Sequence, residues 1–204
     1  MSKMKIFFDS YSKLYRNPAV ARYFKGNFKW IINELPDKRK IKLLDIGCGT
    51  GDLIYSISKS HPDWQICGID ISTCMLKQAQ EKNSAFVLCE GNVHQLPYKE
   101  NMFDIVTNVV SFHHYEKPEK ALNEMYRILK PGGILFLIDS IKDPRCISIL
   151  PWYWDYVEKN KCYTNHLNLK DFRRLFEISK FTSVRIERKY RLWPVVHILC
   201  IAKK

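Results

Sequence analysis

Short apolar runs alternate with amphipathic stretches along most of the chain. Five runs bounded by Gly, Asp or Pro have the length and continuous apolar character of strands buried on both faces of a parallel sheet, at residues 41–46, 65–70, 85–89, 103–109 and 134–139. The stretches between them predict helices at residues 52–60, 72–83 and 118–129, the second with Ser72 as its N-cap. This alternation is typical of βαβ units and predicts a doubly wound α/β domain.

The two ends of the chain have different patterns. Residues 5–35 are rich in aromatic side chains and predict one or two helices before the first strand. Residues 141–167 read as an irregular, aromatic connection, followed by a helix near residues 169–179 and a closing antiparallel pair at residues 183–189 and 194–202. We expect one domain over residues 1–204, with a helical lid at 1–40, a ligand-binding core at 41–140, and a substrate-side connection with the closing strands at 141–204.

Composition narrows the class of protein. With 204 residues, 46% of them hydrophobic, the chain is long enough to bury one core. The seven cysteines contain no Cys-x-x-Cys pair, which predicts reduced thiols and a cytoplasmic location. No apolar stretch reaches the roughly 18 to 20 residues of a transmembrane segment. No histidine or carboxylate spacing indicates a metal site, so none is expected.

Charge is divided unevenly along the chain. The net charge of +12 separates into +8 for residues 1–42, −3 for residues 43–169 and +7 for residues 170–204. An anionic partner, either nucleic acid or the surface of an anionic membrane, would therefore meet the ends. A solvated lysine-rich surface is favoured over a dedicated nucleic-acid face. The pattern says nothing about oligomeric state.

A glycine-rich turn at residues 47–51 carries the strongest chemical signal. It follows a buried strand and opens a helix, and its spacing is Gly47-x-Gly49-x-Gly51 followed by Asp52. Dinucleotide and phosphate loops use other spacings and keep the helix start free for phosphate. Carboxylates at Asp45 and Asp52 would repel phosphate and suit a cationic ligand such as a sulfonium amino acid. Alone, such a turn can also serve packing only.

An acidic residue closes the next strand. Asp70 lies 19 positions beyond Gly51, where a carboxylate can accept hydrogen bonds from both hydroxyls of a ribose. The alternative is that Asp70 only precedes a capped helix. Together with the glycine turn, the ribose role is favoured.

Several segments together resemble one family. They are the glycine turn with its flanks at 43–53, Gly68-Ile69-Asp70-Ile71-Ser72 with Met75-Leu76, Glu90-Gly91-Asn92 before Leu96-Pro97, Phe103-Asp104-Ile105-Val106, and residues 121–133 ending in Lys130-Pro131-Gly132-Gly133. The chain resembles the class I S-adenosylmethionine (SAM)-dependent methyltransferases of methyltransferase type 11, most closely the ubiquinone/menaquinone C-methyltransferase type. The resemblance implies a mostly parallel seven-stranded sheet with helices on both faces, an antiparallel strand near the C-terminus, and SAM as the cofactor.

The resemblance also implies roles for individual residues. The three glycines of the turn would wrap the methionine part of SAM, with Asp45 receiving its ammonium and Asp70 holding the ribose. The adenine ring would lie between Ile71 and Met75. Its amino group would meet Asn92, where the family usually has Asp. Val93, the next residue, would also contact the cofactor. Asn108 would lie beside the methyl group.

The acceptor side is less marked. His113 and His114 are the candidates for a general base, because histidine titrates near physiological pH, although each can equally serve a structural role. Tyr11 and Tyr15, four apart on one predicted helical face, and Trp152 are the candidates for substrate binding. The loop reads Ser111-Phe112-His113-His114 where quinone methyltransferases usually have arginine and asparagine.

Three functions remain open from the sequence. The favoured one is methyl transfer from SAM to a small aromatic or lipophilic metabolite by in-line displacement. The second is an RNA or protein methyltransferase whose basic ends hold an anionic polymer. The third is a SAM-binding regulator without catalysis.

Overall fold

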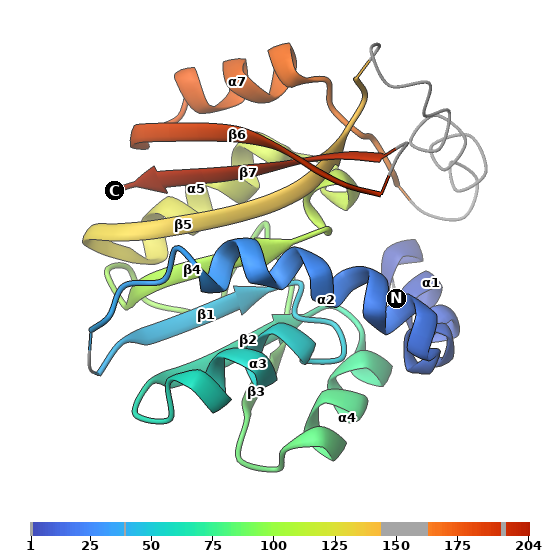
Figure 1. Cartoon of the computed structure of the whole chain (residues 1–204). Helices are drawn as coiled ribbons and strands as arrows, with labels where there is room; N and C mark the ends of the chain where they lie inside the picture. The colour runs from blue at the N-terminus through green and yellow to red at the C-terminus, as the bar shows by residue number, and fades with distance from the viewer. Residues whose placement is uncertain (1, 39, 144–162, 193–194) are drawn as a thin grey trace.

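A seven-stranded sheet forms the centre of the protein (Figure 1). The structure is a computed structural model and describes residues 2–38, 40–143, 163–192 and 195–204. The strand order is β3-β2-β1-β4-β5-β7-β6. Five neighbouring strands run parallel, and the last two pair antiparallel. The predicted fold class is therefore confirmed.

The strands lie close to where the apolar runs predict them. Their bounds are β1 Lys42–Ile46, β2 Gln65–Asp70, β3 Val87–Glu90, β4 Phe103–Val109, β5 Leu129–Ile141, β6 Thr182–Leu192 and β7 Val195–Lys203. Only β5 is much longer than expected, since it continues through Pro131 to Gly133 rather than starting after them. Gly132 has φ +76°, a left-handed conformation that lets the strand bend there.

Helices cover both faces of the sheet because its central strands are apolar on both sides. On β1, Leu43 belongs to a core with α2 (Pro18–Ile32) and α3 (Asp52–Ser60). Leu44 and Ile46 belong to a second core with α5 (Pro118–Ile128) and α7 (Leu169–Glu177). This period of two places the two helical layers on opposite faces, as the doubly wound prediction requires.

The N-terminal segment is helical, as predicted, but broken. Helix α1 (Lys3–Tyr11) is followed by a 3₁₀ turn, η1 (Ser12–Arg16), before α2 begins. Polar contacts fasten α1 to the start of α4 (Thr73–Lys82), because Asp9 accepts hydrogen bonds from the Ser72 hydroxyl at 2.6 Å and from the Cys74 amide at 3.1 Å. Lys5 donates to the Thr73 hydroxyl at 3.0 Å and pairs with Glu90. In consequence α1 lies over the carboxyl end of β1 (Figure 1).

Among the helices in the described parts of the chain, none combines the length and apolar character needed to cross a bilayer.

Candidate active site

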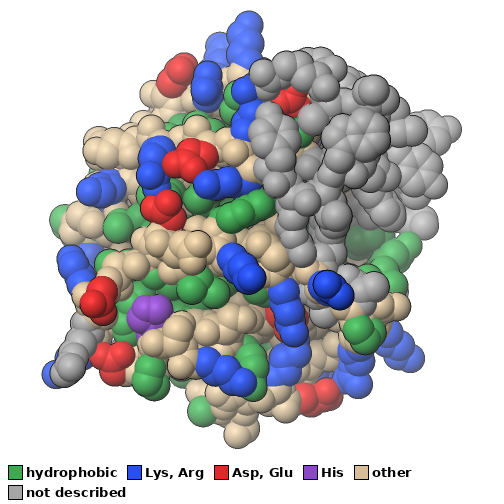
Figure 2. Space-filling view, in the orientation of Figure 1, with side chains coloured by type: hydrophobic (Ala, Val, Ile, Leu, Met, Phe, Trp, Pro, Cys, Tyr) green, Lys and Arg blue, Asp and Glu red, His purple; other side chains and the backbone are tan. Residues whose placement is uncertain are grey.

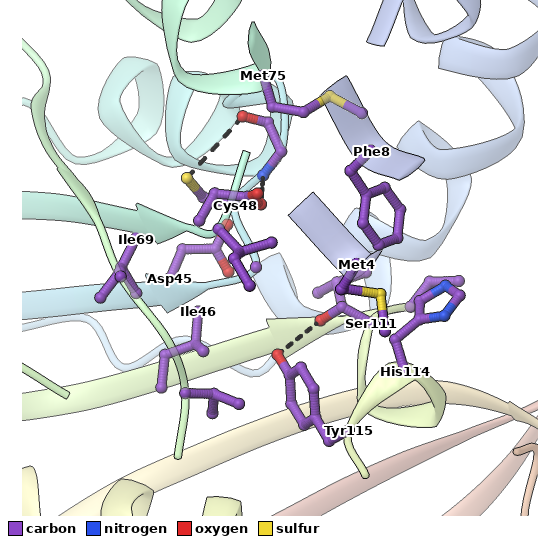
Figure 3. Close-up of a pocket in the computed structure, with 18 of the residues that line it drawn as sticks. Met4, Phe8, Asp45, Ile46, Cys48, Ile69, Met75, Ser111, His114 and Tyr115 are labelled. Carbon is purple, nitrogen blue, oxygen red and sulfur yellow. Dashed lines mark hydrogen bonds between the residues drawn. The ribbon is translucent and has the colours of Figure 1, made fainter. Parts of the chain in front are cut away.

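A pocket of about 260 Å³ opens at the carboxyl ends of β1, β2 and β4, beneath α1 (Figure 3). Side chains far apart in the sequence meet in it. Its walls come from α1, the glycine turn, the end of β2, α4, and the loop after β4. The walls include Met4, Phe8, Asp45, Gly49, Asp70, Met75, Ser111, His114 and Tyr115. The topology explains this convergence, since parallel strands place their carboxyl ends along one edge.

The glycine turn is held by hydrogen bonds from its own amides to the end of β2. The amides of Gly47 and Cys48 both donate to the carbonyl of Ile69, at 2.8 and 3.1 Å, and the Gly49 amide donates to Asp70 at 2.8 Å. All three glycines have positive φ, between +52° and +74°. The turn is thus a fixed ring of backbone, as a ligand cradle requires.

The three glycines serve different needs. A Cβ on Gly49 would meet nothing within 4 Å, so this position leaves room for a ligand against the backbone. A Cβ on Gly51 would lie 2.9 Å from the Cβ of Ala79 in α4, and Gly51 is not part of the pocket wall. Close helix packing therefore requires glycine at position 51, and the ligand-binding role expected of Gly51 stays a prediction.

The polar end of the pocket is acidic. Asp45 is 3% exposed and accepts a hydrogen bond from the Thr107 hydroxyl at 2.7 Å. Burial raises the pKa of Asp45 to about 7, with a further rise from the charge of Asp70 that the Thr107 bond opposes. Burial also raises the pKa of Asp70, although backbone amides bind both of its oxygens. The described residues of the wall include no Lys or Arg, so the pocket suits a cation.

The predicted adenine contacts lie together along one wall. Ile71, Met75, Asn92 and Val93 all line the pocket. The side-chain oxygen of Asn92 already accepts a hydrogen bond from the amide of His94 at 2.9 Å, which leaves it one lone pair for a ligand.

Asn108 lies behind the wall rather than in it. It is fully buried, and its amide nitrogen is within 2.7 Å of the Ile46 carbonyl and the Ser111 hydroxyl and 2.8 Å of the Tyr115 hydroxyl. Asn108 is absent from the wall, which Ser111 and Tyr115 form instead. Asn108 thus contacts these two hydroxyls, and its expected place beside the methyl group stays a prediction. Sequence reasoning missed Tyr115, which carries no motif of its own.

The structure separates the two candidate histidines, which follow each other in the 3₁₀ turn η2 (Phe112–His114). His113 points away from the pocket and its Nδ1 lies 2.6 Å from the buried carboxylate of Asp139. Its ring stacks on that of His166 with centroids 4.2 Å apart. These contacts give His113 a structural role, and the catalytic role expected of it stays a prediction.

His114 is part of the pocket wall. Its Nδ1 lies 3.1 Å from the carbonyl of Tyr163, and its ring meets the Phe8 ring edge-on at a centroid distance of 5.0 Å. Burial, together with the charge of neighbouring His113, lowers the pKa of His114 well below its usual value of 6.5. The ring is therefore neutral at physiological pH.

Comparison with known proteins agrees with this geometry. Residues 44–137 match the family described as a methyltransferase domain. The demethylmenaquinone methyltransferase of Staphylococcus aureus is 26% identical over 88% of this chain and 85% of its own. This chain is a SAM-dependent methyltransferase similar to the class I enzymes.

Solved structures share the fold of this methyltransferase. A chain of the Haloferax volcanii complex that contains the Trm112 methyltransferase activator superposes with a TM-score of 0.80 at 16% identity, covering 96% of each chain. The Haemonchus contortus phosphoethanolamine N-methyltransferase 2, solved with S-adenosylhomocysteine, gives a TM-score of 0.76 at 18% identity over all of this chain and 58% of its own.

The two described residues that were expected to bind the substrate of the methyltransferase differ in position relative to the pocket. Tyr15 lines the pocket, whereas Tyr11 does not and instead stacks on Phe7 with ring centroids 4.4 Å apart. The prediction that the two side chains share one helical face is wrong. The α-helix α1 ends at Tyr11, and the 3₁₀ helix that follows has three residues per turn, so Tyr15 points in another direction than an α-helix would give it. Trp152 lies outside the described residues. Met4 and Phe8, four apart on α1, cover the pocket instead (Figure 3).

Proposed function

We propose that the protein transfers the methyl group of SAM to a small aromatic or lipophilic acceptor, with His114 as the general base. The observation that carries the proposal is the division of the pocket into two ends. One end has buried carboxylates and open backbone at Gly49, and the other has His114 among apolar side chains.

The cofactor would occupy the acidic end. Asp45 would bind the ammonium group, Asp70 the ribose hydroxyls, and Ile71 and Met75 the adenine ring. The open space at Gly49 would take the methionine backbone without collision. When bound, SAM supplies a methyl group on a positively charged sulfur, so the protein has mainly to align the acceptor and remove its proton.

His114 has the properties of that base. Nδ1 of His114 lies near the Tyr163 carbonyl, which only accepts, and 3.2 Å from the Thr164 hydroxyl, which can also accept, so both contacts favour a proton on Nδ1. The Nε2 lone pair is then free of that proton and can accept one from the acceptor as the new bond to the methyl carbon forms and the bond from carbon to sulfur breaks. The edge of Phe8 holds the imidazole plane from the lid side.

The acceptor class follows from the other walls of this end. The apolar side chains of the pocket wall include Met4, Phe8, Phe28, Val109 and Val110, and such walls favour a flat or lipophilic molecule. The similarity to a demethylmenaquinone methyltransferase supports the same class.

The proposal is tested by incubating the protein with methyl-labelled SAM and a cell extract, then separating organic-soluble compounds, polar metabolites, RNA and protein. We expect label in the organic-soluble fraction with wild type and about background with His114→Ala. Label confined to RNA or to protein would overturn the acceptor assignment. SAM binding without any labelled product in these fractions would favour the non-catalytic regulator.

A further inference from the structure

The N-terminal helices present an outer surface of one charge. Asp9 is the only acidic residue among residues 1–33, against seven Lys or Arg. Asp9 faces inward, where it binds Ser72 and Cys74, and Lys5 also turns inward to Thr73. The outward positions are therefore basic. They include Lys3, Lys13, Arg22, Lys25 and Lys29, all exposed.

Two large aliphatic side chains stand among these cations. Ile6 is 52% exposed and Leu14 is 49% exposed, two of only five large hydrophobic residues that are exposed in the described parts of the chain. Ile6 lies one turn from Lys3 on α1, and Leu14 directly follows Lys13 in η1. Figure 2 shows Lys and Arg side chains gathered where α1 and α2 lie in Figure 1, with apolar side chains between them.

The inner face of the same segment lines the pocket. Met4 and Phe8, at i and i+4, point into it, while Lys3 and Ile6 lie on the exposed side of the helix. A single short helix thus separates the apolar end of the pocket from the basic outer surface.

We propose that this outer surface, defined by Lys3, Ile6, Lys13, Leu14, Arg22, Lys25 and Lys29, docks the protein on an anionic membrane. The cations would bind the negative headgroups, and Ile6 and Leu14 would enter the boundary between headgroups and acyl chains. Such docking places α1 at the lipid surface, next to the pocket that the proposed function assigns to a lipophilic acceptor. The docking itself rests on the charge and exposure of these residues, whatever the acceptor.

The aliphatic residues favour a membrane over a nucleic acid. A phosphate backbone is bound by cations, and single-stranded bases are bound by aromatic stacking. Exposed Ile and Leu contribute to neither, whereas both gain free energy when they leave water for acyl chains.

Sedimentation with vesicles tests the surface without SAM or acceptor. Wild type should sediment with phosphatidylglycerol vesicles and stay in solution with phosphatidylcholine vesicles. Lys3→Glu with Lys13→Glu should weaken binding by roughly fivefold per charge or more, because each basic residue near an anionic surface contributes about 1 kcal/mol. Ile6→Asp with Leu14→Asp should weaken it by more than about tenfold, because two apolar side chains are lost and two negative charges are added.

Matched controls alter distant exposed residues of the same kinds. Ile178, 62% exposed at the end of α7, gives Ile178→Asp, and Lys99→Glu with Lys170→Glu reverses two exposed lysines elsewhere. Both should bind vesicles like wild type, and circular dichroism of every variant should match. Unchanged binding by Ile6→Asp with Leu14→Asp would overturn the proposal. The proposal would also be overturned if wild type did not sediment with phosphatidylglycerol vesicles and instead bound tRNA, with the two Asp substitutions leaving that tRNA binding intact. Either failure is distinguishable from failure of the labelling experiment, which measures methyl transfer.

Discussion

The glycine turn after β1 and the loop after β4 face each other across the pocket but are fixed in different ways. Backbone amides hold the turn: those of Gly47 and Cys48 donate to the Ile69 carbonyl, and that of Gly49 donates to the Asp70 carboxylate at the end of β2. Side chains hold the loop: the Asn108 amide binds Ser111 and Tyr115, and the carboxylate of Asp139 accepts from the amide of His113 at 2.7 Å.

This difference indicates which end of the pocket can vary in evolution without loss of the fold. A cradle made of backbone depends on strand geometry and on the absence of side chains, so it suits a part of the ligand that does not change. A loop held by side chains can present other groups when those residues are exchanged. The comparison therefore predicts that substitutions in the loop change catalysis, whereas substitutions in the turn change cofactor binding or folding.

The largest expected effect is on catalysis at the loop. His114→Ala should lower kcat by about 10² to 10⁴, because a general base of this kind contributes that factor. Affinity for SAM, measured by calorimetry, should stay within about twofold. In wild type, kcat at saturating SAM should be constant above pH 6.5 and fall only at lower pH, since burial lowers the pKa of His114 well below 6.5. His114→Gln keeps a polar side chain and should be equally slow. A variant with normal kcat would exclude His114 as the base.

A pair of glycine substitutions tests the turn. Gly47→Ala places a Cβ 2.5 Å from the Ser111 hydroxyl at φ +70°, so it strains the turn and pushes on the loop. We expect the free energy of unfolding to fall by about 2 to 4 kcal/mol, from overpacking and left-handed backbone together. Gly49→Ala has the same backbone strain but meets nothing within 4 Å, so it should cost about 1 to 2 kcal/mol and weaken SAM binding. Equal losses of stability in the two variants would contradict this account.

How much the sequence could predict differs between the same two regions. The turn follows from glycine spacing and neighbouring acids, since backbone geometry and residue type carry that information together. The loop does not. His113 and His114 are adjacent and chemically alike, and only the position of Asp139 and the 3₁₀ turn decides which ring enters the pocket. The break in the helix after Tyr11, which rotates Tyr15 away from the predicted face, likewise has no Gly or Pro to mark it.

Asp45 tests the electrostatics of the turn. Asp45→Asn should weaken SAM binding by about 10²-fold at pH 8, because a charge-assisted bond to the ammonium is lost. In wild type the affinity should fall as pH drops below about 7, by up to tenfold per pH unit, since protonated Asp45 cannot pair with a cation. The variant should show no such dependence, and calorimetry at pH 6 and pH 8 distinguishes the two.

The pH dependence of folding stability that Asp45 causes is opposite in sign to the pH dependence of SAM affinity. Its folded pKa of about 7 is above the model-peptide value of 3.8, so its favourable contribution to folding is complete below about pH 4 and is lost as pH rises through 7. At pH 8 the Asp45→Asn variant should therefore unfold at a higher temperature than wild type in the absence of ligand. A lower unfolding temperature at that pH would contradict the buried, raised-pKa carboxylate.

The smallest effect concerns the backbone at the start of the loop. Val110 has φ +50°, a conformation that β-branched residues rarely adopt, and its amide donates to the Ile138 carbonyl at 2.7 Å. Asn tolerates this conformation, so Val110→Asn should raise the free energy of unfolding by about 1 kcal/mol, or about 2 to 4 °C in Tm for a domain of this size. Val109→Asn is the control. Val109 is half-buried like Val110 but does not have positive φ, so this substitution relieves no strain and should lower Tm. A fall in Tm equal to that of Val109→Asn would show that Val110 contributes packing and that no strain is stored there.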